Sequence, residues 1–385
     1  MNPTNILQQF AKASQQTGRS TLSMLIEWAQ LRAGAGKVGI SEYFDYQIYR
    51  PELSGPEKAS FASYRVQNVL EQILVDDYSR ILSLDKVSYY LLMEGNGLPV
   101  PHTHALYAPS GRYFPRTLLR TPGELADWLA ASTAYPLYLK PSFGGHGKGN
   151  LTLLNYANGE VEQVGGKRVP VRQLAESIED RLGFGWMVQE SLRPHPDIAK
   201  RCGDRISGVR IHAFLSKSGP RILIGVWKIN SGLCDSDNFL QGKVGNLVAE
   251  IDVTSGCITR VVTGIGVDAR LVESHPVTGA KLLGYELPDW DKLVALIGQA
   301  ATVFPGYIYQ GWDIALTDRG PVPLEVNYFG DVDLPQFATG KGFLSPELLD
   351  CMRELGLDTL LPGPSRFAQF NPNGRFGRRR VHWPY

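Results

Sequence analysis

The sequence has few cysteines, and their spacing does not group them. The four are Cys202, Cys234, Cys257 and Cys351 among 385 residues, and no two of them form a C-x-x-C pair. Zinc sites and disulfide frameworks both depend on closely or regularly spaced cysteines. The sequence therefore indicates neither of these, and a reducing cytoplasm is the expected location.

Long apolar runs and an excess of one charge are also missing. No stretch approaches the ~18 apolar residues that a membrane-spanning helix needs, and the N-terminus has no apolar core of signal-peptide length. Lysine and arginine number 39 against 38 aspartates and glutamates, which gives a formal charge of +1. With 43% hydrophobic and 20% charged residues, we expect a folded cytoplasmic protein that binds neither membranes nor nucleic acid.

Two common nucleotide-binding motifs are absent from the glycine-rich segment 142–150. A Walker A loop needs Gly-Lys-[Ser/Thr] leading into a helix, whereas Lys148 precedes Gly149 and an apolar run. A dinucleotide fingerprint fails as well, because the G-x-G-x-x-G spacing and the helix are both missing. The segment instead joins two predicted strands, residues 136–141 and 151–154, as a hairpin whose backbone N–H groups can fold over phosphates. A mobile surface hairpin without a ligand is the alternative.

Helical periodicity dominates the beginning of the chain. Apolar residues recur at helical spacing over residues 5–32 and 56–74, and residues 84–92 form another predicted helix that ends at glycines and prolines. Nothing there alternates strand and helix as a Rossmann unit does. We therefore predict a helical N-terminal region over residues 1–83. Thr-Pro-Gly-Glu at 121–124 predicts a later capped helix that runs to residue 131.

The stretch from Gly311 to Asn327 has the alternation of a β-hairpin. Its two runs supply one apolar face, made of Trp312, Ile314, Leu316, Val322, Leu324 and Val326. A three-residue loop over 318–320, with Gly320 in the left-handed conformation, would pair Thr317 with Pro321. In that register Asp313 lies directly opposite Glu325.

Three oxygen-bearing side chains of this hairpin would then gather together: Asp313, Glu325 and Asn327. Without histidine or cysteine beside them, hard oxygen ligands suit magnesium held against a nucleotide's phosphates better than zinc. The alternative is the solvated polar face of an ordinary hairpin. The hairpin by itself leaves both interpretations open.

Further candidates lie on predicted strands between the two hairpins. Gln189 and Glu190 end a strand that runs into a polar linker at Leu192. Arg210 lies on the polar face of a strand over 207–214, and Lys228 ends its predicted partner strand. Beside a triphosphate the two cations would act as charge clamps. Otherwise they are solvated, and the linker is an ordinary sheet edge.

The order of these residues resembles the ATP-grasp family. The succession is Lys86, Lys140 before the glycine hairpin, Gln189-Glu190, Arg210, Asp313 and Glu325-x-Asn327. Over roughly residues 84–340 the chain is most similar to sugar-transfer-associated ATP-grasp proteins, and more distantly to glutamate ligases and D-alanine:D-alanine ligase. The resemblance implies an α+β fold of two subdomains that grip ATP. We place these subdomains at 84–190 and 191–361, followed by a basic aromatic tail at 362–385 that is either solvated or docks on an acidic surface.

The resemblance also implies a role for each candidate. Phosphate binding falls to two lysines and the glycine hairpin: Lys86, Lys140, Ser142, Gly144, Gly145, His146 and Gly147. Adenine contact falls to Gln189, Glu190 and Leu192. The catalytic candidates are Arg210, facing the γ-phosphate, and Lys228. Two magnesium ions would be bound by Asp313, Glu325 and Asn327.

The family's usual reaction implies an ATP-dependent carboxylate–amine ligase. A substrate carboxylate attacks the γ-phosphate to give an acylphosphate and ADP, and an amine then displaces phosphate to form an amide. The implied cofactors are ATP and Mg²⁺, and the implied partners are a small-molecule acid and amine. Two alternatives remain, a kinase that phosphorylates a small-molecule hydroxyl and a non-catalytic nucleotide-binding protein of a biosynthetic cluster. Many relatives begin with a Rossmann-like domain where this chain begins with helices, so the resemblance does not identify the substrate.

Overall fold

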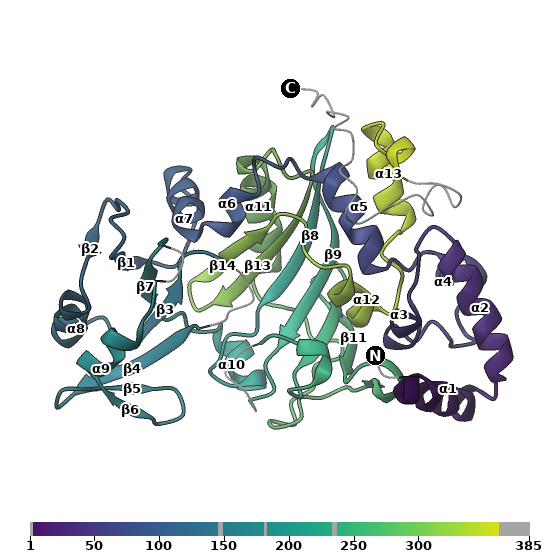
Figure 1. Ribbon diagram of the computed structural model, residues 1–385, viewed down its shortest axis with the longest axis horizontal. Coiled ribbons are helices and arrows are strands. Elements are labelled where there is room, and N and C mark those ends of the chain that lie inside the picture. Colours follow the sequence, from purple (N-terminus) through teal and green to yellow (C-terminus); the bar gives the residue numbers. More distant parts are fainter. Residues whose placement is uncertain (1–2, 145–148, 181–182, 233–236, 362–385) are drawn as a thin grey trace.

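The computed structural model describes residues 3–144, 149–180, 183–232 and 237–361, and two seven-stranded sheets organise it (Figure 1). The first sheet has the strand order β2-β1-β7-β3-β4-β5-β6. Its strands are β1 (Thr103–Tyr107), β2 (Thr117–Leu119), β3 (Leu137–Pro141), β4 (Leu151–Ala157), β5 (Glu160–Gln163), β6 (Arg168–Pro170) and β7 (Trp186–Glu190). Helices α8 (Pro122–Ala131) and α9 (Val171–Ser177) pack together and share an apolar core with this sheet.

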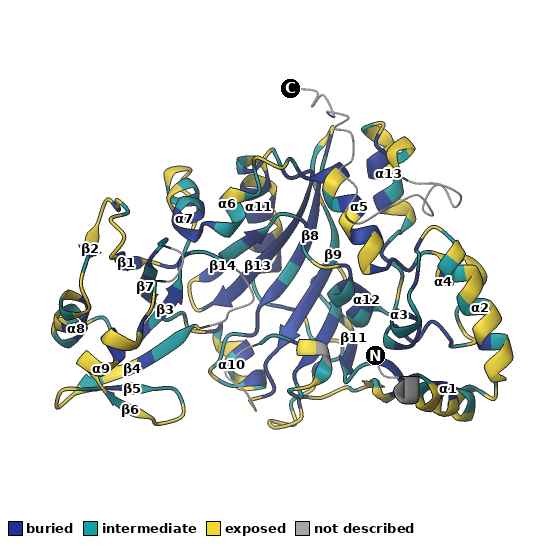
Figure 2. Cartoon of the chain, in the orientation of Figure 1, coloured by how far each residue is buried: buried dark blue, intermediate teal, exposed yellow. Residues whose placement is uncertain are grey.

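The second sheet is antiparallel throughout and has the order β12-β11-β10-β9-β8-β13-β14. Its strands are β8 (Val209–Ser216), β9 (Gly219–Ile229), β10 (Leu247–Ile251), β11 (Ile258–Thr263), β12 (Arg270–Leu271), β13 (Tyr309–Thr317) and β14 (Gly320–Asn327). Helix α11 (Trp290–Ala300) lies against β9 and β14, and α12 (Asp333–Thr339) lies against β9, β10 and β11. Figure 2 shows β8 and β13 of this sheet mostly buried.

Helices precede the first strand, as the sequence predicts. They are α1 (Pro3–Thr17), α2 (Thr21–Ala33), α3 (Ile40–Asp45), α4 (Gly55–Ala59), α5 (Tyr64–Leu74), α6 (Ile81–Leu84) and α7 (Lys86–Gly95). The single helix expected over 5–32 is two helices, because the chain turns at Gly18 with φ +70° and Ser20 caps α2. Residues of α1 to α3 share a core of their own, whereas α5 and α7 pack into the core of the second sheet.

The remaining helices are α10 (Pro196–Cys202), α13 (Pro346–Glu354) and four short 3₁₀ turns, η1 (Leu240–Gly242), η2 (Gly266–Asp268), η3 (Ala301–Val303) and η4 (Asp358–Leu360). Within the described ranges, no helix is both long and apolar enough to cross a membrane. The subdomain boundaries at 83, 190 and 361 stay a prediction.

Several local predictions are confirmed. The strands around the glycine hairpin are β3 and β4, which pair Leu137 with Leu153. The capped helix is α8, where Thr121 Oγ1 accepts a hydrogen bond of 3.1 Å from the Glu124 N–H. The predicted strands carrying Arg210 and Lys228 are the neighbours β8 and β9.

The hairpin of β13 and β14 has the predicted pairing through a different turn. Asp313 does pair with Glu325, but Thr317 pairs with Gly320, so the expected three-residue loop is wrong and residues 318 and 319 alone connect the strands. A β-bulge absorbs the difference, because Ile314 pairs with Pro323 and Leu324 is the extra residue. Two prolines of β14 lack the N–H that a central strand needs, and β14 lies at the sheet edge where proline is tolerated.

Candidate active site

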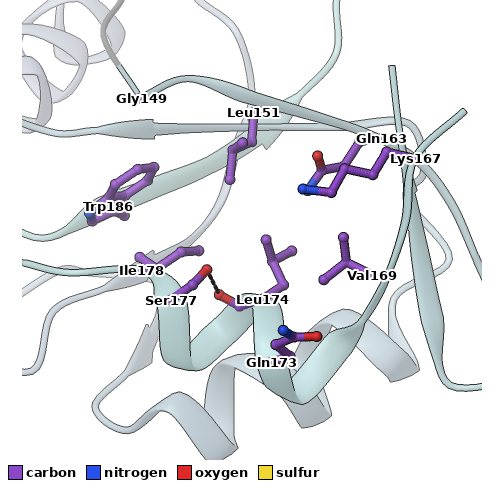
Figure 3. A pocket seen from close by; sticks show the side chains of 10 residues that line it. All are labelled: Gly149, Leu151, Gln163, Lys167, Val169, Gln173, Leu174, Ser177, Ile178 and Trp186. Carbon is purple, nitrogen blue, oxygen red and sulfur yellow. Dashed lines mark hydrogen bonds between the residues drawn. The ribbon is translucent and has the colours of Figure 1, made fainter. Parts of the chain in front are cut away.

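A cavity of about 1810 Å³ lies between the two sheets. Lys86 of α7 and Lys140 of β3 line it from one side, and Arg210, Asp313 and Glu325 line it from the second sheet. A smaller cavity of about 400 Å³ lies on the side of the first sheet, between β4, β5, β6 and α9 (Figure 3). Lys167 is the one charged residue among the described residues that line it. The charged groups predicted from the sequence therefore gather in the larger cavity.

Three neighbouring strands set a row of charged residues along the floor of this cavity. Arg210 on β8 pairs with Asp313 on β13, and Asp313 pairs with Glu325 on β14. The Arg210 guanidinium holds the Asp313 carboxylate with both ends, Nε–Oδ1 at 2.7 Å and Nη2–Oδ2 at 2.8 Å. The side chains are only 12% and 7% exposed. The solvated-face interpretation of Asp313 is therefore wrong.

Lys228 completes the floor. Its Nζ lies 3.2 Å from Asp313 Oδ1 and 3.5 Å from Asp237 Oδ2, and its side chain is 9% exposed. Burial alone would raise the pKa of Asp313, yet Arg210 and Lys228 together hold that pKa well below its ordinary value. Burial would lower the pKa of Lys228, but Asp237 and Asp313 raise it above its ordinary value. Asp313 and both catalytic candidates are thus charged at neutral pH.

The two lysines of the opposite wall lack such partners. Lys86 Nζ donates to the Gly144 carbonyl, and Lys140 Nζ donates to the Tyr90 hydroxyl at 2.7 Å. Among the described residues, neither makes an ion pair with a carboxylate. Burial lowers the pKa of both, and for Lys140 burial together with the charge of Lys86 lowers it to about 7. A bound polyanion would offset this unfavourable burial.

The linker residues lie at the edge of the first sheet, where they also line the cavity. Gln189 is 1% exposed, and its Nε2 donates to Thr103 Oγ1 at 3.0 Å. Glu190 Oε1 accepts from the His102 N–H at 2.6 Å and pairs with Arg319, from the turn between β13 and β14. This ion pair connects the first sheet to the second sheet beside the cavity. Leu192 lines the same edge.

The glycine hairpin is only partly described. Gly144 lines the cavity. Ser142 is fully buried, and its hydroxyl donates to the Phe184 carbonyl at 2.5 Å, so its side chain is engaged away from the cavity. Gly145, His146 and Gly147 lie outside the described residues, as does the tail from residue 362.

Magnesium binding would depend on Glu325, Asn327 and Asp313, all of which line the cavity. Asn327 Nδ2 donates to the Gly311 carbonyl at 3.3 Å, which leaves the amide oxygen as the acceptor for a cation. In the described part of the chain, no three histidine, cysteine, aspartate or glutamate side chains are grouped to hold a metal. The oxygen donors fit magnesium in kind, and Asp313 would have to share its carboxylate between the cation and Arg210. The metal-binding role stays a prediction.

Sequence reasoning missed three groups that shape this site. Tyr90 lies four residues after Lys86 on α7, and that spacing on one helix face is a signal that could have found it. Asp237, beside Lys228, has no comparable sequence pattern. From α5, Tyr64, Gln67 and Glu71 line the cavity, so the helical N-terminal region builds part of its wall.

Comparison with solved structures finds enzymes of low sequence similarity. Three of them are N5-carboxyaminoimidazole synthase from Aspergillus clavatus, L-amino acid ligase from Bacillus licheniformis and VanG D-Ala:D-Ser ligase from Enterococcus faecalis. Each is 14% identical with a TM-score of 0.38, over 72%, 74% and 76% of this chain. The chain spans only 56%, 49% and 63% of their respective lengths. No curated protein matches the chain.

A family assignment comes from the sequence itself. The sugar-transfer associated ATP-grasp family matches residues 72–349, which is more than half of the chain. The match includes every described strand of both sheets, since β1 begins at Thr103 and β14 ends at Asn327. It also includes every predicted site residue. The chain belongs to the sugar-transfer associated ATP-grasp family.

Proposed function

We propose that the protein is an ATP-dependent carboxylate–amine ligase that forms an amide bond through an acylphosphate. The observation that carries the nucleotide part is the pair Lys86 and Lys140, two buried lysines that face one cavity without an ion pair to a carboxylate among the described residues. The phosphates of ATP would supply the missing negative charge. In this proposal the nucleotide lies between residues 84–190 and 191–361.

The size of the cavity supports a reaction with more than one substrate. Its volume of about 1810 Å³ exceeds the roughly 300–1,000 Å³ of a usual small-molecule pocket. Gln189, Glu190 and Leu192 would meet the adenine at one edge, and Tyr64, Gln67 and Glu71 of α5 line another part. An acid and an amine would occupy the space that the nucleotide leaves.

The chemistry needs positive charge at the place where the phosphate oxygens accumulate negative charge. An oxygen of the substrate carboxylate bonds to the γ-phosphorus while the bond from phosphorus to the ADP oxygen breaks. Arg210 and Lys228 place permanent charge at the floor, and Asp313 keeps both side chains in position. Magnesium bound by Asp313, Glu325 and Asn327 would add further charge neutralisation. The amine then attacks the acyl carbon and releases phosphate.

Product analysis tests the proposal. Pairs of small carboxylic acids and amines are screened for ADP release, and the products are identified by mass spectrometry. An amide that forms together with ADP and phosphate supports the ligase. A phosphorylated hydroxyl compound would identify a kinase instead, and ATP binding without any ADP release would identify a non-catalytic nucleotide-binding protein.

Lys140→Met is expected to weaken ATP binding. The variant loses a charge-assisted hydrogen bond to phosphate, worth about 1.5–3 kcal/mol, or roughly ten- to a hundredfold in Kd. Titration calorimetry measures the change. Lys167→Met, which removes a lysine from the smaller cavity, is the matched control and should bind as the wild type does. Equal ATP affinities for all three proteins would contradict the assignment of Lys140.

ATP binding is also expected to take up a proton near neutral pH. The pKa of Lys140 is lowered to about 7, so much of this lysine is neutral in the free protein above that pH, whereas phosphate favours the ammonium form. Affinity should therefore fall as pH rises from 7 to 9. Calorimetry in two buffers of different ionisation enthalpy measures the uptake. Lys140→Met should show less uptake, and a wild type without any uptake would refute the prediction.

The lowered pKa of Lys140 also determines how its contribution to folding stability changes with pH. Because the folded pKa of Lys140 lies below the unfolded lysine value of about 10.4, the unfolded chain binds more protons between these two values. The contribution of Lys140 to stability therefore rises with pH from about 7 to 10.4 and is lost as pH falls through that window.

A further inference from the structure

Tyr90 of α7 connects the two halves of the cavity through one hydroxyl group. That hydroxyl accepts a hydrogen bond of 2.7 Å from Lys140 Nζ, on β3 of the first sheet. It donates one of 2.6 Å to the Leu324 carbonyl, on β14 of the second sheet. Tyr90 is 2% exposed, and Lys140 Nζ also lies 4.7 Å from the centre of its ring. A single buried group therefore contacts both walls.

The Leu324 carbonyl belongs to the bulge that sets the register of the floor. Leu324 is the residue without a partner in the pairing between β13 and β14, and Glu325 follows it directly. The bulge is what brings Glu325 opposite Asp313 despite the two-residue turn. By accepting the Tyr90 O–H, the carbonyl of the bulged residue gains a fixed partner from α7.

We propose that Tyr90 is a positioning residue that couples the phosphate-side lysine Lys140 to the bulge that presents Glu325. The identity of the bound groups rests on the proposed function, but the two hydrogen bonds do not depend on it. The hydroxyl holds Lys140 Nζ toward the cavity and keeps the backbone before Glu325 in place. It also favours the ammonium form of Lys140, because its oxygen accepts an N–H bond from that form.

Tyr89→Phe offers a matched control for Tyr90→Phe. Tyr89 is the adjacent residue of α7 and is 1% exposed, but its hydroxyl has no hydrogen-bond partner among the described residues. Both substitutions remove one buried hydroxyl from one helix and keep the ring. A general packing effect would therefore appear in both variants, whereas loss of the coupling would appear in Tyr90→Phe alone.

The first measurement is an NMR titration of lysine Cε in the protein without nucleotide, with the Lys140 signal assigned by its loss in Lys140→Met. Tyr90→Phe is expected to move the Lys140 midpoint to lower pH, and Tyr89→Phe to leave it unchanged. The other charges that act on Lys140 are Lys86 of α7 and Glu325 of β14, and both variants keep them. Because this readout needs no ligand, it tests the coupling even if the protein does not bind ATP.

The second measurement is ATP affinity together with ADP release. Tyr90→Phe is expected to weaken ATP binding about tenfold and to lower kcat as well, since Glu325 loses the support of the bulge. Added to Lys140→Met, Tyr90→Phe should weaken ATP binding little further. Tyr89→Phe should match the wild type in affinity and kcat.

A Lys140 midpoint that is the same in both variants, or fully additive losses with Lys140→Met, would overturn the proposal. If Tyr90→Phe does not fold, 4-fluorophenylalanine at position 90 keeps the ring, fills the place of the hydroxyl and is a much weaker acceptor that cannot ionise. It should then lower the Lys140 midpoint, and an unchanged midpoint would be equally decisive against the coupling.

Discussion

Glu325→Gln is expected to slow ADP release by about a hundredfold or more, because each 1.4 kcal/mol of lost transition-state stabilisation is roughly tenfold in rate. Glu325 lies opposite Asp313, lines the cavity and raises the pKa of both wall lysines, Lys86 and Lys140, against the effect of burial. The substitution keeps the shape of the side chain and removes the charge that would hold magnesium. Turnover should therefore fall far more than stability.

The effect on stability follows from the charges around Glu325. The sequence places it in a group of acidic ligands, where loss of one carboxylate would relieve repulsion. In the structure the charge of Glu325 raises the pKa of four cationic side chains, Lys86, Lys140, Arg210 and Lys228, so its own charge is favourable there. We therefore expect Glu325→Gln to lower the melting temperature slightly in the absence of ligand.

A thermal-shift titration with magnesium and ATP, run beside the ADP-release assay, measures both effects. Glu354→Gln is the control, because Glu354 lies in a surface ion pair with Arg221 whose side chains are 42% and 40% exposed. It should respond to magnesium and ATP as the wild type does. If Glu325→Gln also responds as the wild type does in both assays, Glu325 does not bind metal.

Local patterns predicted the strands better than they predicted the turns. Alternation identified β13 and β14, and it put Asp313 and Glu325 on paired strands. The loop was wrong because Gly320, at φ +105°, opens β14 instead of closing the turn. The bulge at Leu324 then restored the pairing, and nothing in the local alternation distinguishes Leu324 from an ordinary apolar strand residue.

Contacts between distant segments lay beyond the sequence pattern. Arg210 and Lys228 were predicted as cations on neighbouring strands, but their joint contact with Asp313 depends on β13 pairing with β8, about a hundred residues away in the chain. Tyr90 reads as one apolar residue of an amphipathic helix until β3 and β14 are placed on either side of it. Patterns of local spacing carry no information on such pairings.

Arg210→Met is expected to destabilise the fold by about 3 kcal/mol, at the lower end of the usual cost of leaving one member of a buried pair uncompensated. Asp313 would stay 5% exposed with Lys228 as its remaining cationic contact, at 3.2 Å. Urea unfolding monitored by circular dichroism measures the loss. Lys12→Met, in the exposed pair with Asp268 whose side chains are 54% and 74% exposed, should change stability by less than about 0.5 kcal/mol.

Two comparisons separate this charge effect from lost packing. Adding Asp313→Asn to Arg210→Met should recover much of the stability, because the double variant leaves no unpaired carboxylate in the core.

The contribution of Asp313 to the pH dependence of folding stability should also change sign between the wild type and Arg210→Met. In the wild type the depressed pKa of Asp313 stabilises the fold above the unfolded aspartate value of about 3.9, and this contribution is lost as pH falls. Without Arg210, burial moves that pKa upward, so the deficit of Arg210→Met should shrink as pH falls from 7 toward 4. A deficit that stays constant with pH and survives Asp313→Asn would show that Arg210 contributes packing and not charge.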